Sequence, residues 1–161
     1  MLFPRVVRLD DSDDRVYEPA AAAGEWAVPG AFVFLDIDMA QAGGKLRQAF
    51  HHGFLGTDSF GWGTLVQVEE IAFAEYAAVV ERLAQHFVQR LNAPSIDAAR
   101  EMAQEEAAFA ASICEHPRHT LLAVDRALGE EGIEENFRVV RPPSGLDHEK
   151  IKLWKIVEDD G

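Results

Sequence analysis

The sequence predicts an α+β fold, in which a twisted, mostly antiparallel sheet carries a pair of long antiparallel helices on one face. Short β-branched or aromatic runs bounded by turn residues occur near both ends of the chain, whereas residues 70–115 carry apolar side chains at helical spacing. With 161 residues, 48% of them hydrophobic and 27% charged, the chain has the size and composition of one globular domain. We therefore expect residues 1–161 to form a single α+β domain.

Two runs in the first third are predicted to be strands. Residues 5–9 and 31–35 are rich in β-branched or aromatic side chains and are bounded by turn residues. Residues 10–14 contain four aspartates and are interpreted as a solvated hairpin turn. A calcium-binding loop is the alternative, but the EF-hand pattern lacks its glycine at the sixth position and its glutamate at the twelfth.

A short helix and a glycine-rich loop follow. Asp38 and Gln41 have the spacing of a capping box, and the firm part of the helix is expected over 45–52, with Gly53 at its C-terminal cap. Residues 54–63 intersperse glycines with aromatic residues, which predicts a loop with aromatic anchors. A further strand is expected over 64–68.

Two long amphipathic helices are predicted between residues 70 and 115. In the first, apolar side chains recur every three or four positions up to residue 92. The positions expected to face the core are Phe73, Ala77, Val80, Ala84, Phe87 and Leu91. Ser95 is a good N-cap for the second helix, which ends before Pro117. Because only a short break joins them, the two helices should pack as an antiparallel hairpin.

The last third contains one ambiguous segment. Residues 120–128 fit either a short buried helix or a strand. Residues 129–135 are rich in glutamate and are expected to form a solvated loop, while 137–141 are predicted to be a strand. Residues 150–157 alternate apolar and charged side chains, which predicts a strand with one solvated face.

Charge and cysteine content limit the possible classes of function. The formal net charge of −13 repels phosphate backbones and anionic lipids, so we expect neither nucleic-acid nor membrane partners. No signal-peptide core and no apolar run long enough to span a membrane is found. The single cysteine, Cys114, excludes an intrachain disulfide. These features predict a cytoplasmic protein.

One segment departs from this acidic composition. No carboxylate occurs between Asp38 and Asp58, and this window contains Lys45, Arg47, His51 and His52. On a helix, Arg47 and His51 are four residues apart and share one stripe, because side chains at this spacing are neighbours on the helix surface. The window therefore predicts a local positive patch on an acidic molecule.

This patch precedes the glycine-rich loop, whose backbone amides can approach a ligand closely. The segment 45–62 is therefore a candidate site for a small anion, and its candidate ligand-binding residues are Lys45, Arg47, His51, His52, Asp58, Ser59 and Trp62. The alternative is that the cations pair with surface acids elsewhere on the fold, each exposed pair contributing about 0 to 1 kcal/mol. A nucleotide-binding P-loop is excluded, since its first glycine and its Ser or Thr after the lysine are missing.

A second cluster lies between Cys114 and His119. A metal site using Cys114, His116 and His119 is one reading, since thiol and imidazole ligands suit zinc. The other reading is a buried thiol at a helix end, where histidines interact well with the helix dipole. No second Cys pair exists to complete a structural zinc site, so we expect no metal and no cofactor.

Residues 44–61, which read GKLRQAFHHGFLGTDSFG, and residues 25–32, which read EWAVPGAF, resemble a family of small bacterial proteins of unknown function. The resemblance covers roughly the whole chain. It implies a stand-alone bacterial protein in the cytoplasm, and it transfers no catalytic residue.

Three hypotheses of function follow. The first is a binding or accessory protein without catalytic activity, which engages a small anionic ligand or a protein partner through residues 45–62. The second is a metal-assisted or acid–base enzyme of hydrolase type, which uses His51, His52 and Asp58 or the cluster from Cys114 to His119. The third is a structural subunit that forms a homodimer through an exposed sheet face.

Overall fold

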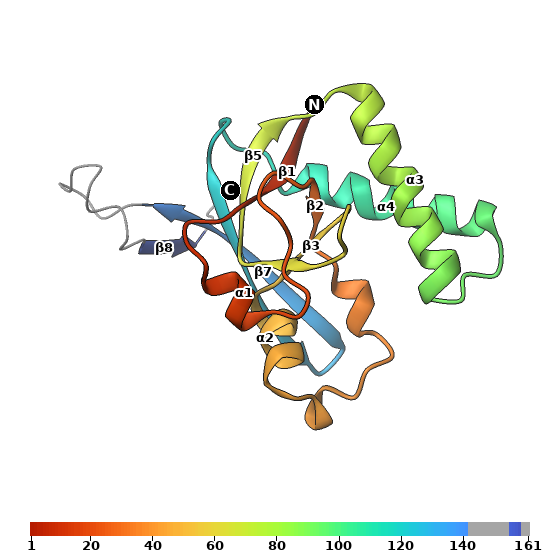
Figure 1. Cartoon of the computed structure of the whole chain (residues 1–161), viewed down its shortest axis with the longest axis horizontal. Helices are drawn as coiled ribbons and strands as arrows, with labels where there is room; N and C mark the ends of the chain where they lie inside the picture. Colours follow the sequence, from red (N-terminus) through yellow and green to blue (C-terminus); the bar gives the residue numbers. More distant parts are fainter. Residues whose placement is uncertain (142–154, 159–161) are drawn as a thin grey trace.

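The computed structural model describes residues 1–141 and 155–158 and has the predicted α+β architecture (Figure 1). Its main feature is an antiparallel five-stranded sheet in the order β1-β5-β6-β7-β8. These strands are β1 (Leu2–Val7), β5 (Leu65–Glu70), β6 (Leu121–Gly129), β7 (Gly132–Arg141) and β8 (Lys155–Glu158). The ambiguous segment 120–128 is therefore a strand. The predicted strand 150–157 falls partly outside the described residues, and its described part belongs to β8.

A smaller sheet forms where a loop was expected. β3 (Phe54–Gly56) pairs antiparallel with β2 (Ala27–Val28) and with β4 (Trp62–Gly63). The loop prediction over 54–63 is thus correct only for the part between β3 and β4. The predicted loop 129–135 is likewise correct only for residues 130 and 131, since β6 extends to Gly129 and pairs there with Gly132, the first residue of β7.

Four short helical segments surround this smaller sheet. They are α1 (Ser12–Val16), the 3-10 helices η1 (Ala31–Phe34) and η2 (Met39–Gln41), and α2 (Gly44–His52). The helix predicted over 45–52 is confirmed, with Gly53 at its C-terminal cap. Two predictions were wrong: residues 10–14 enter α1 instead of a hairpin turn, and 31–35 form η1 instead of a strand.

The local geometry at Gly30 explains the second error. Gly30 has a φ of 84°, a left-handed conformation that ends the extended chain of β2, and an added Cβ would lie 2.7 Å from the Cβ of Leu55. The chain then coils, so that Phe32 packs edge-on against Phe87 and Phe34 edge-on against Phe50. Tertiary packing of the aromatic rings therefore outweighs the β propensity of this run.

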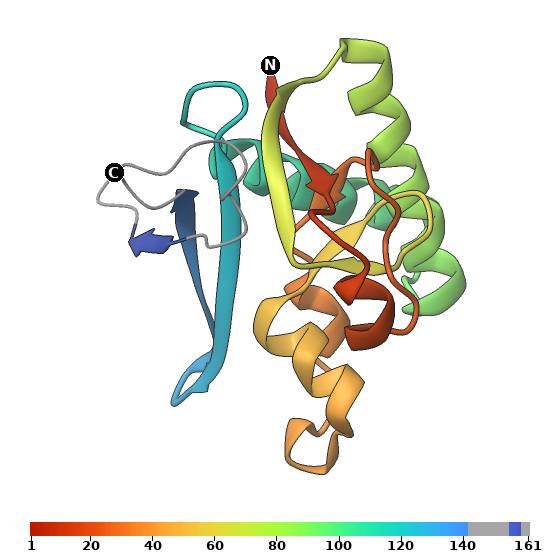
Figure 2. The same ribbon diagram turned by 60° about the vertical axis from the view of Figure 1, so that its left-hand side comes forward.

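The helix hairpin is present as predicted. α3 (Phe73–Arg90) and α4 (Ile96–Ser112) pack on each other, and the Ser95 side chain caps α4 by accepting a hydrogen bond from the Ala98 N–H at 3.1 Å. Ala84 and Phe87 of the expected stripe are buried, but Phe73 is 84% exposed, and Ala77 and Leu91 are also exposed. Val79 and Leu83, which were not predicted, complete the buried face of α3. α4 contacts β1 and β2. Figure 2 shows α3 on the side of the molecule away from the β6–β7 hairpin, while α4 reaches across so that Phe109 contacts Phe137 of β7.

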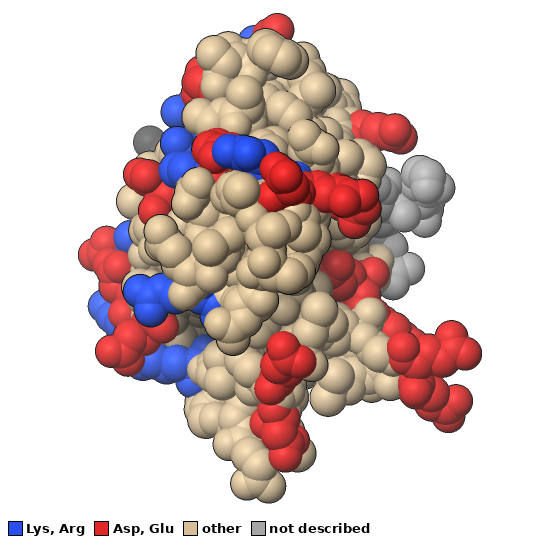
Figure 3. Space-filling model, turned by 90° about the vertical axis from the view of Figure 1, so that its right-hand side faces the viewer, with Lys and Arg blue, Asp and Glu red and all other residues tan. Residues whose placement is uncertain are grey.

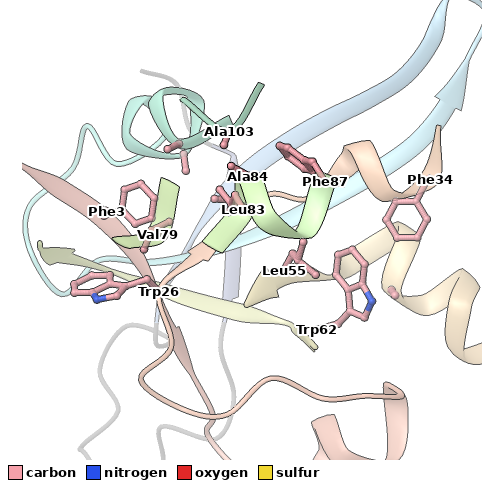
Figure 4. Packing of buried hydrophobic residues seen from close by; sticks show 14 of the residues in the cluster. Phe3, Trp26, Phe34, Leu55, Trp62, Val79, Leu83, Ala84, Phe87 and Ala103 are labelled. Carbon is pink, nitrogen blue, oxygen red and sulfur yellow. The ribbon is translucent and has the colours of Figure 1, made fainter. Parts of the chain in front are cut away.

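The main core lies between the helix hairpin and the smaller sheet (Figure 4). From α3 it contains Val79, Leu83, Ala84 and Phe87, and from α4 a stripe of alanines that includes Ala103. Small side chains on α4 allow the two helices to approach closely. Leu55 and Trp62 join this core from the smaller sheet, and Trp26 joins it from the residue before β2.

Candidate functional site

Helix α2 places two of the predicted basic side chains against strand β6. The Nδ1–H of His51 donates a hydrogen bond of 2.8 Å to the carbonyl oxygen of Arg126. The Nδ1 of His52 lies 3.3 Å from the carbonyl oxygen of Val124 and 3.2 Å from Oδ1 of Asp125. Both imidazoles therefore fix α2 to the sheet.

A buried arginine completes this junction from the side of the sheet. The guanidinium of Arg126 is fully buried, and its Nη1 donates to the carbonyl oxygens of Ala49, Phe50 and Gly53 at 3.3, 3.0 and 2.7 Å. These carbonyls belong to the C-terminal end of α2, where a helix lacks internal donors and attracts positive charge.

Two further groups stabilise the Arg126 cation. Its Nη2 donates to the carbonyl oxygen of Pro29, and its Nε donates to Oε2 of Glu135 at 2.7 Å. Burial lowers the pKa of Arg126, and the hydrogen bond and charge of Glu135 oppose that change. Arg126 thus has a structural role: it holds α2, the turn before η1 and β7 together.

Beside this junction lies a hollow of about 280 Å³, which we call the α2 pocket. Its lining residues are Met39, Ala40, Arg47, Phe50, His51, Ala127 and Leu128. Most of this lining is apolar, and Arg47 and His51 supply its cationic or hydrogen-bonding groups. The Nη2 of Arg47 lies 3.4 Å from the carbonyl oxygen of Met39, which it donates to. The pair predicted to share one helix stripe therefore lines one hollow.

The other two basic residues of the window have acidic neighbours. The Nζ of Lys45 lies 3.7 Å from Oε2 of Glu18, with both side chains exposed, and His52 is beside Asp125 as described above. Neither Lys45 nor His52 lines the α2 pocket. The four basic residues thus divide into one pair at a hollow and one pair beside acids.

The remaining predicted residues lie in a different part of the fold. The N–H groups of Asp58 and Ser59 and the hydroxyl of Ser59 donate to the carboxylate of Glu25, at 3.0, 2.7 and 2.8 Å. Trp62 is a core residue, 6% exposed and stacked on Phe34 with ring centroids 5.1 Å apart. The seven predicted residues therefore do not converge on one site.

The loop that contains Asp58 and Ser59 borders a second hollow, which we call the α3 cleft. It has a volume of about 400 Å³ and is lined by Ser59, Phe60, Glu81, Arg82, Gln85, His86, Gln89 and Arg90. Sequence reasoning missed its helical residues, since charges on the outer side of an amphipathic helix resemble an ordinary solvated face. Their signal was the spacing of Arg82, His86 and Arg90, which places three basic groups on successive turns of one stripe.

The cluster from Cys114 to His119 is not arranged as a metal site. The Cys114 thiol is buried, and burial raises its pKa to about 12. The Nδ1 of His119 lies near Gln67 Nε2 and Glu69 Oε1, at 3.0 and 2.9 Å. Within the described part of the chain, no group of three or more His, Cys, Asp or Glu side chains has an arrangement that could hold a metal ion.

The second hypothesis also grouped His51 and His52 with Asp58. In the structure the two histidines contact β6, whereas Asp58 lies on the loop held by Glu25. The hollows beside these two regions share no lining residue. The structure therefore does not bring these three side chains to a common centre.

The fold and the two hollows define a small α+β protein with candidate binding sites at opposite ends of residues 45–62. None of the helices in the described part of the chain combines the length and apolar character needed to cross a bilayer. The chain belongs to the family of unknown function DUF6505, whose model matches residues 1–153. No curated protein and no solved structure matches the chain.

Proposed function

We propose that this protein is a binding protein that takes up a small amphipathic anion, a carboxylate with a short apolar chain, in the α2 pocket. The observation that carries the proposal is the composition of this hollow: Arg47 and His51 share it with Met39, Phe50 and Leu128. A lining that is mostly apolar, with few polar groups, is typical of sites for small molecules.

Each part of such a ligand has a counterpart in the pocket. The Arg47 guanidinium presents paired N–H groups that suit a carboxylate, and charge-assisted hydrogen bonds of this kind are among the strongest in proteins. Because the Nδ1–H of His51 is used on the carbonyl of Arg126, its Nε2 is the ring atom left to meet a ligand, and Nε2 can donate to a carboxylate oxygen when the ring is the imidazolium cation.

The apolar chain of the ligand would lie on the other side of the pocket. Leu128 is 60% exposed, so a bound alkyl chain would remove apolar surface from water. Burial of each methylene contributes about 0.8 kcal/mol, or roughly a fourfold gain in affinity. We therefore expect affinity to rise with chain length until the pocket is filled.

The proposal also includes a location in the bacterial cytoplasm and a role without catalysis. The buried Cys114 thiol, which has no second cysteine to pair with, is consistent with a reducing compartment. A homodimer stays a prediction, and light scattering on the full chain measures it.

Titration calorimetry on the full chain with butyrate, hexanoate and octanoate tests the proposal. We expect affinity to increase from butyrate to octanoate and the Arg47→Gln variant to bind about tenfold more weakly, the loss expected for one charge-assisted hydrogen bond. Lys45→Gln is the matched control, since it removes one positive charge from the same helix outside the pocket.

Two outcomes would contradict the proposal. One is the absence of heat and of any chain-length dependence with the unmodified protein. The other is an equal loss of affinity in the Arg47→Gln and Lys45→Gln variants, which would show a general effect of charge instead of a contact in the pocket.

A further inference from the structure

We propose that the α3 cleft is a second, separate binding site and that it takes a phosphomonoester or free phosphate through Arg82, His86 and Arg90. These three side chains follow each other at four-residue intervals along α3 and line the same hollow of about 400 Å³. The inference is independent of the α2 pocket, because the two hollows share no lining residue.

The loop wall of the cleft is fixed before any ligand binds. The carboxylate of Glu25 accepts hydrogen bonds from Ser59 and Asp58, as described above, and also from the Ala22 N–H at 2.6 Å. Burial alone would raise the pKa of Glu25, but these hydrogen bonds outweigh burial and hold it below its ordinary value. Glu25 therefore stays ionised while it holds the loop.

This loop presents Phe60 in an unusual conformation. Phe60 has a φ of 55°, which bulky residues rarely adopt, and its ring lies parallel to that of His86 with centroids 3.9 Å apart. Strained backbone of this kind is retained when the surrounding structure holds it, and it concentrates at functional sites. The stacked pair gives the cleft an apolar edge beside its cations.

The helix wall supplies the positive charge. The Nε of Arg82 donates to the carbonyl oxygen of Thr57 at 3.0 Å, which fixes the side chain against the loop and leaves its two terminal NH₂ groups for other partners. Arg90 lies two turns further along, is exposed, and acts electrostatically on His86. Burial and the charge of Arg90 lower the pKa of His86. A bound anion would oppose this effect, because a nearby negative charge favours the protonated form.

The carboxylate in the lining does not cancel this charge. Glu81 accepts two hydrogen bonds from Arg100, from Nε and Nη2, both at 3.1 Å, and a third from Gln85. Arg100 does not line the cleft. Because Glu81 is matched by a cation on α4, Arg82 and Arg90 remain as the surplus charge of the cleft. Figure 3 shows the side of the molecule that lies to the right in Figure 1, where basic and acidic side chains lie next to one another in small groups and broad uncharged areas separate these groups.

Two guanidinium groups and one imidazole favour a dianion over a monocarboxylate. A phosphate group presents several oxygens that accept bidentate hydrogen bonds from arginine. The ring pair of Phe60 and His86 then provides a surface for the organic part of a phosphomonoester. The α2 pocket, with its mostly apolar lining, suits a monocarboxylate with an apolar chain instead.

NMR titration of the full chain with inorganic phosphate and with phenyl phosphate tests the inference. We expect the amide resonances of residues 58–61 and 82–90 to shift on addition of either probe. Stronger binding of phenyl phosphate would identify an ester, and equal binding would identify free phosphate, and both results support the site.

The variant Arg90→Gln should weaken this binding about tenfold, since Arg90 is exposed and contributes to the cleft through its charge. Arg118→Gln is the control, because it removes an exposed cation that pairs with Glu69 and Glu70 and does not line the cleft. No shift in residues 58–61 and 82–90 with either probe, or equal weakening in the two variants, would overturn the inference.

Discussion

Glu106 is a partly buried carboxyl group that makes the stability of the fold depend on pH. Its side chain lies between α4 and the turn before η1, where Oε1 accepts a hydrogen bond of 3.2 Å from the Gly30 N–H. Burial raises the pKa of Glu106, and the nearby charge of Glu135 raises it further, while the Gly30 hydrogen bond and Arg126 act in the opposite direction. The ionised form of Glu106 is therefore disfavoured in the folded protein.

The Glu106→Gln variant should be more stable than the unmodified protein at neutral pH. A group whose pKa is raised by folding contributes stability below its unfolded pKa, here near 4.5, and loses that contribution as the pH rises through its folded pKa. Glutamine keeps an oxygen for the Gly30 N–H and cannot ionise. Urea unfolding of both proteins from pH 4 to pH 8 checks this expectation, and a stability difference that stays constant or shrinks as the pH rises would contradict it.

At the scale of secondary-structure elements, Arg126 joins α2 to the main sheet. Replacing it with methionine would remove a donor from three carbonyls at the end of α2 and leave Glu135 without its cation. Among the residues that the structure describes, only Ala49 of these three keeps another donor, the Gly53 N–H. Breaking a buried ion pair in this way costs about 3 to 5 kcal/mol. We expect Arg126→Met to lower the free energy of unfolding by that amount.

The control for this prediction is Glu135→Gln, which keeps an oxygen that can accept from Nε of Arg126. This variant removes the counter-charge of Arg126, but the cation keeps its carbonyl acceptors, so the loss should be smaller, about 1.5 to 3 kcal/mol. Denaturant unfolding of the two variants distinguishes the two cases. If both variants lost the same small amount, the carbonyls of α2 would not depend on Arg126.

The helices and strands differ in how well the sequence predicts them. α3 and α4 were predictable because their periodicity extends over many turns and Ser95 supplies a local cap. The run 31–35 was not, because it is apolar at every position and its conformation depends on rings that are distant in the sequence, such as Phe50 and Phe87. Where hydrophobic periodicity is short or absent, tertiary contacts determine which secondary structure the segment adopts.

Across the whole molecule, the candidate site was predictable only in part. The acid-free window pointed to Arg47 and His51, which line one hollow and whose shared stripe follows from helix geometry alone. That Lys45 faces Glu18, and that the loop after β3 turns toward α3, depends on where the chain returns in space. The basic stripe of α3 became visible as a site only once this loop was placed beside it.

The net charge of the whole molecule explains why an anion site must contain its own cations. A net charge of −13 repels anions in general, and salt screens that repulsion at distances beyond about 10 Å at 0.1 M ionic strength. Uptake of an anion at a defined place therefore requires local cations, and the structure offers two such places of different chemistry. We infer that, of these two places, the α2 pocket selects an amphipathic carboxylate.

An NMR titration of the full chain with octanoate tests this claim most directly. We expect shifts in the amide resonances of residues 47–51 and 126–128, with residues 82–90 unchanged. In Arg47→Gln the same shifts should need about tenfold more octanoate, whereas Lys45→Gln should need no more than the unmodified protein. Shifts spread evenly over the chain, or none at residues 47–51 and 126–128, would contradict it.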